Sequence, residues 1–271
     1  TYLKSIAYYT GYQNSAIVTE LYTLTQGSGG SGQFTYPYGI TTDGTYLYIA
    51  GMNNNLVKRM DLLINQSGTA WTAVSSGSAT MSGPRGVTYS AGYLYVADYS
   101  NNIILKINAS TPGSTADVLT TGISNPRGIC NDGTYLYVLC NNGRLYKIII
   151  STGAIDTANF NSPNGYVSTG QAGMCTFDSG VVYTSDLSSG TINKYNASNG
   201  SSAGTFSIAG VDVTGIFIRS GYLYSATGGS GGQVVKSNLS GIIQTTWTPT
   251  EAGVSLRGIC FAGTQWYVAD G

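Results

Sequence analysis

Hydrophobic and polar positions alternate in short runs along most of this chain, which is the spacing of β-strands with one buried face. The runs are rich in Tyr, Val and Ile, as in the segment YLYVAD at 93–98, and Asp-Gly or Ser-Gly pairs often separate them. Such pairs favour the tight turns that join neighbouring antiparallel strands. The pattern therefore predicts an all-β protein.

One segment recurs six times: a glycine with apolar residues, a short turn, and then a run close to Tyr-Leu-Tyr-Val-Ala. The copies begin at Gly39, Gly86, Gly128, Gly173, Gly215 and Gly258. Successive glycines are 42–47 residues apart. A period of this length is typical of the four-stranded blades of a β-propeller, and it is longer than the period of most helical or leucine-rich repeats.

Within each copy, two further positions repeat. The second tyrosine of the run falls at one register, at Tyr48, Tyr95, Tyr137, Tyr183, Tyr224 and Tyr267. A third expected strand carries a lysine at a constant place, at Lys58, Lys106, Lys147, Lys194 and Lys236. We expect the tyrosines to pack in the core and the lysine stems to lie along the blades with their ammonium groups in solvent.

The sixth copy ends at Asp270-Gly271, where its third strand should begin. The start of the chain, Tyr2-Leu3-Lys4-Ser5-Ile6, matches third strands such as Ile104–Ile107. We therefore expect residues 1–25 to complete the blade that residues 256–271 begin, which would leave no open sheet edge at the closure. The expected fold is one domain over residues 1–271, a six-bladed propeller with four-stranded antiparallel blades.

The blade pattern resembles the NHL repeat. The likeness rests on Pro-Arg-Gly-Val, then Tyr-Leu-Tyr-Val-Ala-Asp, then Asn-Asn-Ile-Ile-Leu-Lys-Ile, and is clearest over Pro84–Ile107. The resemblance implies a propeller and says little about activity, since its relatives include RNA-binding domains, lyases, lactonase-like enzymes, receptor ectodomains and scaffolds. Function has to be argued from individual sites.

Charged residues make up only 9% of the chain, with 12 basic and 12 acidic side chains. A chain without net charge creates no general attraction for DNA, RNA or an anionic membrane. Its many uncharged polar residues are typical of extracellular or surface proteins, either of cells or of virions, and the low charge permits copies to associate. No apolar stretch is long enough to span a membrane. The expected partners are other copies, surface proteins or glycans.

Five Asn-x-Ser motifs are candidate N-glycosylation sites. They begin at Asn65, Asn108, Asn196, Asn199 and Asn238. The alternative is that some arise by chance in a chain this rich in Asn and Ser.

The four cysteines are too few for a disulfide framework in a chain of 271 residues. Cys130, Cys175 and Cys260 share one position of the repeat, so they fall on equivalent strands of different blades. We interpret them and Cys140 as buried thiols that fill small apolar spaces.

The residue before each repeat glycine is expected at the mouth of the central channel, where the first strand of a blade begins. These residues are Tyr38, Arg85, Arg127, Ala172, Thr214 and Arg257. Three guanidinium groups beside a tyrosine favour an anion, a glycan or a nucleotide, which makes Tyr38, Arg85, Arg127 and Arg257 the candidate ligand-binding residues. The structural alternative is that Asp98 and Asp270 form ion pairs with Arg85 and Arg257.

The sequence gives little support for a catalytic function. The chain contains no histidine, which removes the commonest general base and every His-ligated metal, so the lyase activity within the resembled group does not carry over. The positions where lactonase-like relatives place acidic and amide ligands hold Thr41, Thr42, Thr88, Tyr89, Asn131 and Thr176. We expect no catalytic residues, no metal and no cofactor.

These observations favour a non-enzymatic extracellular propeller that serves in adhesion, ligand binding or assembly, with glycan binding as the sharpest form of that hypothesis. A lactonase-like or other hydrolase acting at the channel mouth is one alternative. An NHL-type RNA-binding domain is another, and the absence of net charge weakens it.

Overall fold

A computed structural model describes residues 4–5, 21–24, 36–62, 72–73, 81–111, 113–170, 173–187, 189–208, 212–229, 231–248 and 255–271. These residues form strands, turns and short connections, without a helix in any of the described segments. Consequently, none of them provides an apolar helix able to cross a membrane.

Five blades repeat one pattern, in which four consecutive strands form an antiparallel meander. The first blade contains β3 (Pro37–Thr42), β4 (Tyr46–Gly51), β5 (Leu56–Asp61) and β6 (Thr72–Ala73). The second contains β7 (Pro84–Ser90), β8 (Tyr93–Asp98), β9 (Ile103–Asn108) and β10 (Asp117–Thr120). The third contains β11 (Pro126–Asn131), β12 (Tyr135–Cys140), β13 (Arg144–Ile149) and β14 (Tyr166–Ser168).

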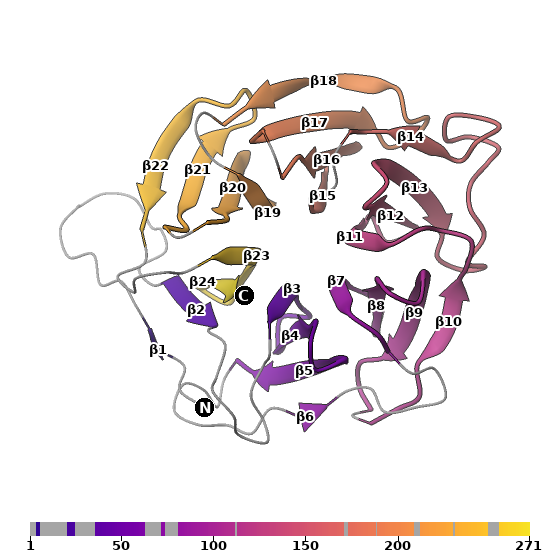
Figure 1. The fold of residues 1–271 in the computed structure, drawn as a ribbon, viewed down its shortest axis with the longest axis horizontal. Helices are drawn as coiled ribbons and strands as arrows, with labels where there is room; N and C mark the ends of the chain where they lie inside the picture. Colours follow the sequence, from indigo (N-terminus) through magenta and orange to yellow (C-terminus); the bar gives the residue numbers. More distant parts are fainter. Residues whose placement is uncertain are drawn as a thin grey trace.

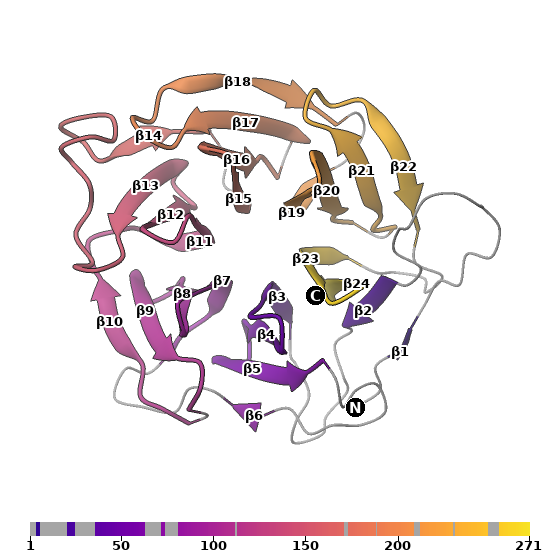
Figure 2. The ribbon, with the colours of Figure 1, turned by 180° about the vertical axis from the view of Figure 1, so that it is seen from behind.

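The fourth blade contains β15 (Cys175–Asp178), β16 (Val181–Ser185), β17 (Thr191–Asn196) and β18 (Ser202–Ser207). The fifth contains β19 (Val213–Arg219), β20 (Tyr222–Thr227), β21 (Val234–Asn238) and β22 (Ile243–Trp247). The blades stand around a common axis, with the first strand of each innermost (Figure 1; Figure 2 shows the opposite face). This arrangement is a β-propeller.

A further four-stranded sheet joins the two ends of the chain, and it departs from the pattern of the five blades. Its order is β1 (Lys4–Ser5), β2 (Leu21–Leu24), β24 (Gln265–Asp270) and β23 (Leu256–Ala262). Strand β2 runs parallel to β24, and the strand that contains Lys4 is outermost rather than third. The prediction of six four-stranded antiparallel blades is therefore wrong, because only five blades follow that pattern.

The physical reason lies in the connections. A short hairpin forces two consecutive strands to be antiparallel, and the five blades are built from such hairpins. No hairpin joins the start of the chain to its end, so β2 was free to pair with β24 in either direction. The repeat could not predict which direction it takes.

The Asp-Gly hairpins hold the repeated tyrosines. Asp43 accepts hydrogen bonds from the backbone N–H groups of Thr45 and Tyr46, and its second oxygen accepts one from the Tyr48 hydroxyl at 2.7 Å. Asp132 does the same in the third blade, where the hydroxyl of Tyr137 is 2.8 Å from its Oδ2. Each of these turns is thus tied to a tyrosine buried in the core, as expected from the aligned register.

The hydrophobic core lies between consecutive blades. Tyr48 of the first blade packs in one cluster with Leu94 of the second. The sheet at the chain ends takes part in the same way, because Tyr267 packs in one cluster with Leu47 of the first blade. Each blade therefore depends on both neighbours for the burial of its apolar residues.

Five of the six repeat glycines lie where the inner strands of two blades approach closely. A Cβ on Gly86 would be 2.5 Å from the carbonyl oxygen of Arg127, and one on Gly128 would be 2.8 Å from the Cα of Met174. Gly39, Gly215 and Gly258 face the backbone of the following blade in the same way. Only a residue without a side chain permits this approach, which explains why the repeat retains glycine.

The third-strand lysines are not all solvated as expected. The Lys147 ammonium lies 3.5 Å from the Asp156 carboxylate, and both side chains are almost completely buried. The ammonium also lies 3.9 Å from the centroid of the Tyr135 ring. Lys106 and Lys236 stack in the same way on Tyr93 and Tyr222. In these three blades the repeated lysine therefore pairs with the first tyrosine of the preceding strand, a contact that neither position reveals alone.

Replacing Gly86 by Ala is expected to destabilise the protein by about 3 kcal/mol, because the added methyl group would push the inner strands of two blades apart. Urea unfolding followed by tryptophan fluorescence would measure the change. Gly231→Ala is the matched control, since Gly231 has no atom near its Cβ position and no left-handed backbone, and it should change stability little. Equal stability of the two variants would contradict the role given to close approach.

The cysteines should react slowly with iodoacetamide at pH 8 in the native protein. All four are buried thiols, and burial raises the pKa of the Cys140 thiol to about 12, so little thiolate exists at that pH. Burial also raises the pKa of Cys130 and Cys260. Mass spectrometry should find four labels in urea, and rapid labelling of any cysteine before unfolding would contradict this expectation.

Candidate functional site

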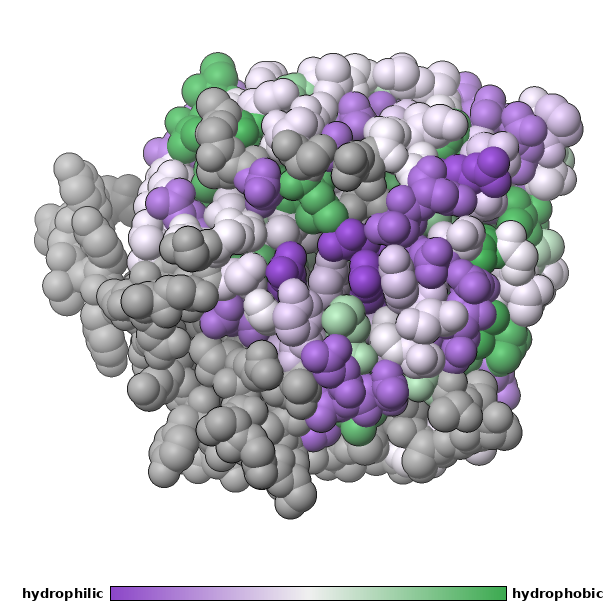
Figure 3. All heavy atoms as spheres, viewed as in Figure 1, coloured by the Kyte–Doolittle hydropathy of each residue, from purple (hydrophilic) through white to green (hydrophobic). Residues whose placement is uncertain are grey.

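The starts of four inner strands converge at one end of the ring. Tyr38, Arg85, Arg127 and Arg257 are each the second residue of β3, β7, β11 and β23. Because inner strands of neighbouring blades approach closely, these side chains meet around the axis. We call them, together with Tyr36 and Tyr99, the mouth cluster. Hydrophilic side chains gather around the centre of the face drawn in Figure 3.

Tyr38 is the centre of the mouth cluster. The residue is only 2% exposed. The guanidinium carbons of the three arginines surround it, at 5.5 Å for Arg85, 5.3 Å for Arg127 and 5.9 Å for Arg257, each measured to the ring centroid. A ring carries negative charge on its faces, which attracts cations and lowers the cost of placing three of them together.

The arginines also bond to tyrosine hydroxyls. Arg127 donates from Nε to the Tyr38 hydroxyl at 2.6 Å and donates to the same oxygen from Nη2. Arg257 donates to the Tyr36 hydroxyl at 2.8 Å. Arg85 stacks on Tyr99, with its guanidinium carbon 3.4 Å from the ring centroid. Neutral aromatic side chains thus position all three cations.

The arrangement leaves guanidinium donors without acceptors. The Nε atoms of Arg85 and Arg257 are buried and bond to no acceptor within the described residues. A buried donor of this kind is costly unless another group accepts its hydrogen bond. Burial lowers the pKa of Arg85, and the neighbouring positive charge of Arg127 adds to this effect.

Asp98 does not form the ion pair with Arg85 that the sequence allowed as an alternative to ligand binding. Its Oδ1 accepts a hydrogen bond from the backbone of Ser82 at 2.9 Å, and its Oδ2 accepts one from the Asn101 amide at 2.8 Å. Asp270 accepts a bond from the backbone of Ser255 at 2.7 Å. Asp98 therefore supports the turns beneath the mouth, and the electrostatic partners of Arg85 are tyrosines.

Thr214, which was also expected at the mouth, offers no free hydroxyl to a ligand. The Thr214 hydroxyl donates within its blade to the carbonyl of Ala226 at 3.0 Å and also contacts the carbonyl of Leu256. Ala172 lies outside the described residues. The cluster is therefore assembled on one side of the mouth, from the first three blades and the sheet at the chain ends.

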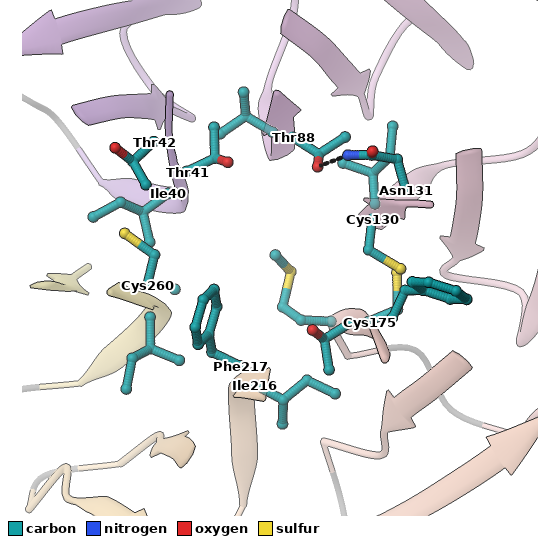
Figure 4. Close-up of a pocket in the computed structure, with 18 residues that line it drawn as sticks. Ile40, Thr41, Thr42, Thr88, Cys130, Asn131, Cys175, Ile216, Phe217 and Cys260 are labelled. Carbon is teal, nitrogen blue, oxygen red and sulfur yellow. Dashed lines mark hydrogen bonds between the residues drawn. The ribbon is translucent and has the colours of Figure 1, made fainter. Parts of the chain in front are cut away.

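Below the mouth, the inner strands enclose a cavity of about 300 Å³. Its polar lining includes Thr41, Thr88 and Asn131, and the Asn131 amide donates to the Thr88 hydroxyl at 2.7 Å (Figure 4). Cys130, Cys175 and Cys260 also face it. None of the described residues that line this cavity is acidic, and the described part of the chain holds no group of three or more His, Cys, Asp or Glu residues arranged for a metal ion.

A second pocket, of about 400 Å³, adjoins the mouth cluster. The turns of the first two blades form it, and Arg85 and Tyr99 line it together with Met52, Asn53, Asn55, Ser82, Gly83 and Ser100. Sequence reasoning missed this pocket and the two extra tyrosines. The available signals were that Tyr99 directly follows Asp98 at the turn after β8, and that Tyr36 precedes the proline of the first copy.

The candidate glycosylation motifs have a structural role where they are described. Asn108, Asn196 and Asn238 each end the third strand of a blade. Asn108 and Asn238 accept backbone hydrogen bonds from the serines two residues later, at 3.0 Å in both cases, as does Asn199 from Ser201 at 2.9 Å. The repeated Asn-x-Ser therefore forms a turn. Asn65 lies outside the described residues, and glycosylation stays a prediction at all five.

No protein-family model matches the chain, and no curated protein matches it in sequence. Solved structures do match its fold. A chain of a nidogen/laminin complex is 18% identical, with 84% of this chain and 86% of that chain covered and a TM-score of 0.67. Virginiamycin B lyase from Staphylococcus aureus is 19% identical, covering 89% and 79%, with a TM-score of 0.63.

Aldose sugar dehydrogenase from Streptomyces coelicolor, solved with bound PQQ, is 15% identical, covering 89% and 87%, with a TM-score of 0.62. At such identities the likeness shows the fold alone. The protein is thus a β-propeller, and its structural neighbours include both a protein of a binding complex and enzymes.

Tyr38→Phe should destabilise the protein by about 2 kcal/mol, because it removes the oxygen that accepts two hydrogen bonds from a charged and partly buried guanidinium. Thermal unfolding would measure the loss. Tyr36→Phe removes one such acceptor at a more exposed position and should cost about half as much. A neutral Tyr38→Phe variant would show that the hydroxyl does not hold Arg127.

Proposed function

We propose that this protein is a non-enzymatic extracellular propeller that binds an anionic ligand at the mouth cluster. The observation that carries the proposal is the pair of buried Nε donors, on Arg85 and Arg257, that have no acceptor within the described residues. An anion at the mouth supplies oxygens to such donors and neutralises part of the clustered positive charge.

The composition of the cluster supports binding of a discrete anionic group. Guanidinium is planar and matches the two oxygens of a carboxylate, or two oxygens of a sulfate or phosphate. The arginines are held by tyrosine rings and hydroxyls, so they are already ordered before a ligand arrives. Preorganisation of this kind reduces the entropy that binding must overcome.

The residues present in the chain and in its channel favour binding over catalysis. The chain has no histidine, and the channel positions that carry acidic ligands in lactonase-like propellers hold threonine and asparagine, as at Thr41, Thr88 and Asn131. A hydrolase would need a general base or a metal-bound water near the ligand. RNA binding is disfavoured by the zero net charge.

The same proposal includes the location of the protein and its partners. We take residues 1–271 as one domain of NHL-like repeats that is located outside the cell or on a cell or virion surface, where its partners are surface proteins, glycans or other copies of the chain. The low charge and the Asn-x-Ser motifs support this view. The nidogen/laminin neighbour, a propeller found in a protein complex, supports a binding role for such a fold.

The test is a calorimetric titration with sulfate at low ionic strength. Arg257→Gln should raise the dissociation constant at least about tenfold, since it removes one of the two arginines whose Nε has no acceptor within the described residues. Arg219→Gln is the matched control: Arg219 ends the inner strand β19, whereas the mouth arginines lie near the starts of theirs, so this variant should bind within about twofold of the unchanged protein.

Absence of sulfate binding by the unchanged protein, or equal binding by both variants, would overturn the proposal. A salt-dependent shift of single-stranded RNA that is lost in Arg127→Ala would instead favour nucleic-acid binding.

A further inference from the structure

The pocket beside Arg85 is lined mainly by uncharged polar groups, whereas the mouth cluster is cationic. The two would therefore bind different parts of a ligand. Asn53 and Asn55 come from the turn between β4 and β5, and Ser82 and Ser100 come from turns of the second blade. These amide and hydroxyl groups are uncharged. Arg85 lines the pocket and also belongs to the mouth cluster, so one side chain takes part in both.

The turns around the pocket are tied to one another. The Asn55 side-chain oxygen accepts a hydrogen bond from the backbone N–H of Gly83 at 2.8 Å, which links the first blade to the second. The backbone of Ser100 donates to the carbonyl of Ser82 at 3.1 Å. Both Asn55 and Gly83 have left-handed backbones, with φ of 54° and 61°. These hydrogen bonds hold the turns in place, so the pocket is defined by the junction between the first two blades.

The next junction shows what keeps this pocket open. Asn125 precedes β11 as Gly83 precedes β7, and its backbone N–H donates to Asn102 in the way that Gly83 donates to Asn55. The side-chain amide of Asn125 then reaches back to the carbonyl of Tyr99 at 3.2 Å. At the pocket, Gly83 has no side chain to occupy the corresponding space.

We propose that the pocket beside Gly83 is a saccharide subsite, so that the anion bound at the mouth is the acidic group of a sugar such as a hexuronate. The inference rests on the proposed function. A volume of about 400 Å³ accommodates a small ligand such as one sugar ring.

The lining matches the chemistry of a sugar. Sugar hydroxyls both donate and accept hydrogen bonds, which suits the amides and hydroxyls of Asn53, Ser82 and Ser100. The apolar C–H face of the ring suits Met52 and Tyr99. The carboxylate of the same sugar would then face Arg85, whose buried Nε lacks an acceptor within the described residues.

The test compares D-glucuronate with sulfate as probes, titrated into the unchanged protein and into Gly83→Asn. This variant copies the neighbouring junction, and asparagine tolerates the left-handed backbone that Gly83 has. Its Cβ would lie 2.9 Å from the Ser100 hydroxyl oxygen, a rotatable group that can move aside. We expect glucuronate to bind at least tenfold more weakly to the variant and sulfate to bind equally well.

Asn53→Ala is the second variant, chosen because Asn53 is an exposed turn residue whose replacement should not impair folding. It should weaken glucuronate several-fold and leave sulfate unchanged. Circular dichroism and thermal unfolding would establish that both variants are folded.

The outcomes separate the two proposals. If the unchanged protein binds neither probe, the anion site itself is wrong. If it binds sulfate but binds glucuronate no more tightly, or if both variants bind glucuronate as the unchanged protein does, the anion site stands and the saccharide subsite is overturned.

Discussion

The close approach of the inner strands at the repeat glycines is the constraint on which the rest of the structure depends. A side chain at Gly86 or Gly258 would collide with the backbone of the adjoining sheet, so the ring forms only with glycine there. Because these glycines set the level at which neighbouring inner strands meet, the residue before each of the five closely packed glycines lies at a similar level of the ring. That residue is an arginine in three sheets and Tyr38 in a fourth, and the mouth cluster is the direct result.

The cluster concentrates charge in a chain that carries very little of it. Fewer than one residue in ten is charged, yet three guanidinium groups lie within 6 Å of one tyrosine ring. Aromatic faces and hydroxyls hold these cations in place of carboxylates, and such neutral partners leave the positive charge available to a ligand. The buried pair Lys147 and Asp156 shows the opposite solution, in which the carboxylate supplies the compensation inside the protein and leaves no demand for an external anion.

Structures with this fold include a protein of a laminin complex, a lyase and a dehydrogenase. The fold therefore does not indicate whether a protein binds or catalyses. The choice depends on the groups that the inner strands present to the channel and its mouth. In this chain the mouth presents organised cations, the cavity beneath it presents hydroxyls, an amide and thiols, and the pocket beside Arg85 presents uncharged polar groups. This division into a cationic and an uncharged polar subsite suits the acidic sugar that we propose as the ligand.

The sequence by itself determined the propeller class, the inner hairpins with their Asp-Gly turns, the burial of the aligned tyrosines and the position of Tyr38 and the three arginines near the starts of the inner strands. These features follow from a local period and from short connections, which repeat in the chain as they do in space. Only the tertiary structure decided the parallel pairing of β2 with β24, the ion pair of Lys147 with Asp156, the engagement of Asp98 by its own turns and the pocket beside Gly83. The pairing of β2 with β24 and the pocket beside Gly83 join segments that no short turn connects, so packing between sheets sets their geometry. Asp156 lies one tight turn beyond Lys147, and Asp98 bonds to the turns around it, but these side-chain contacts are not part of the pattern that repeats.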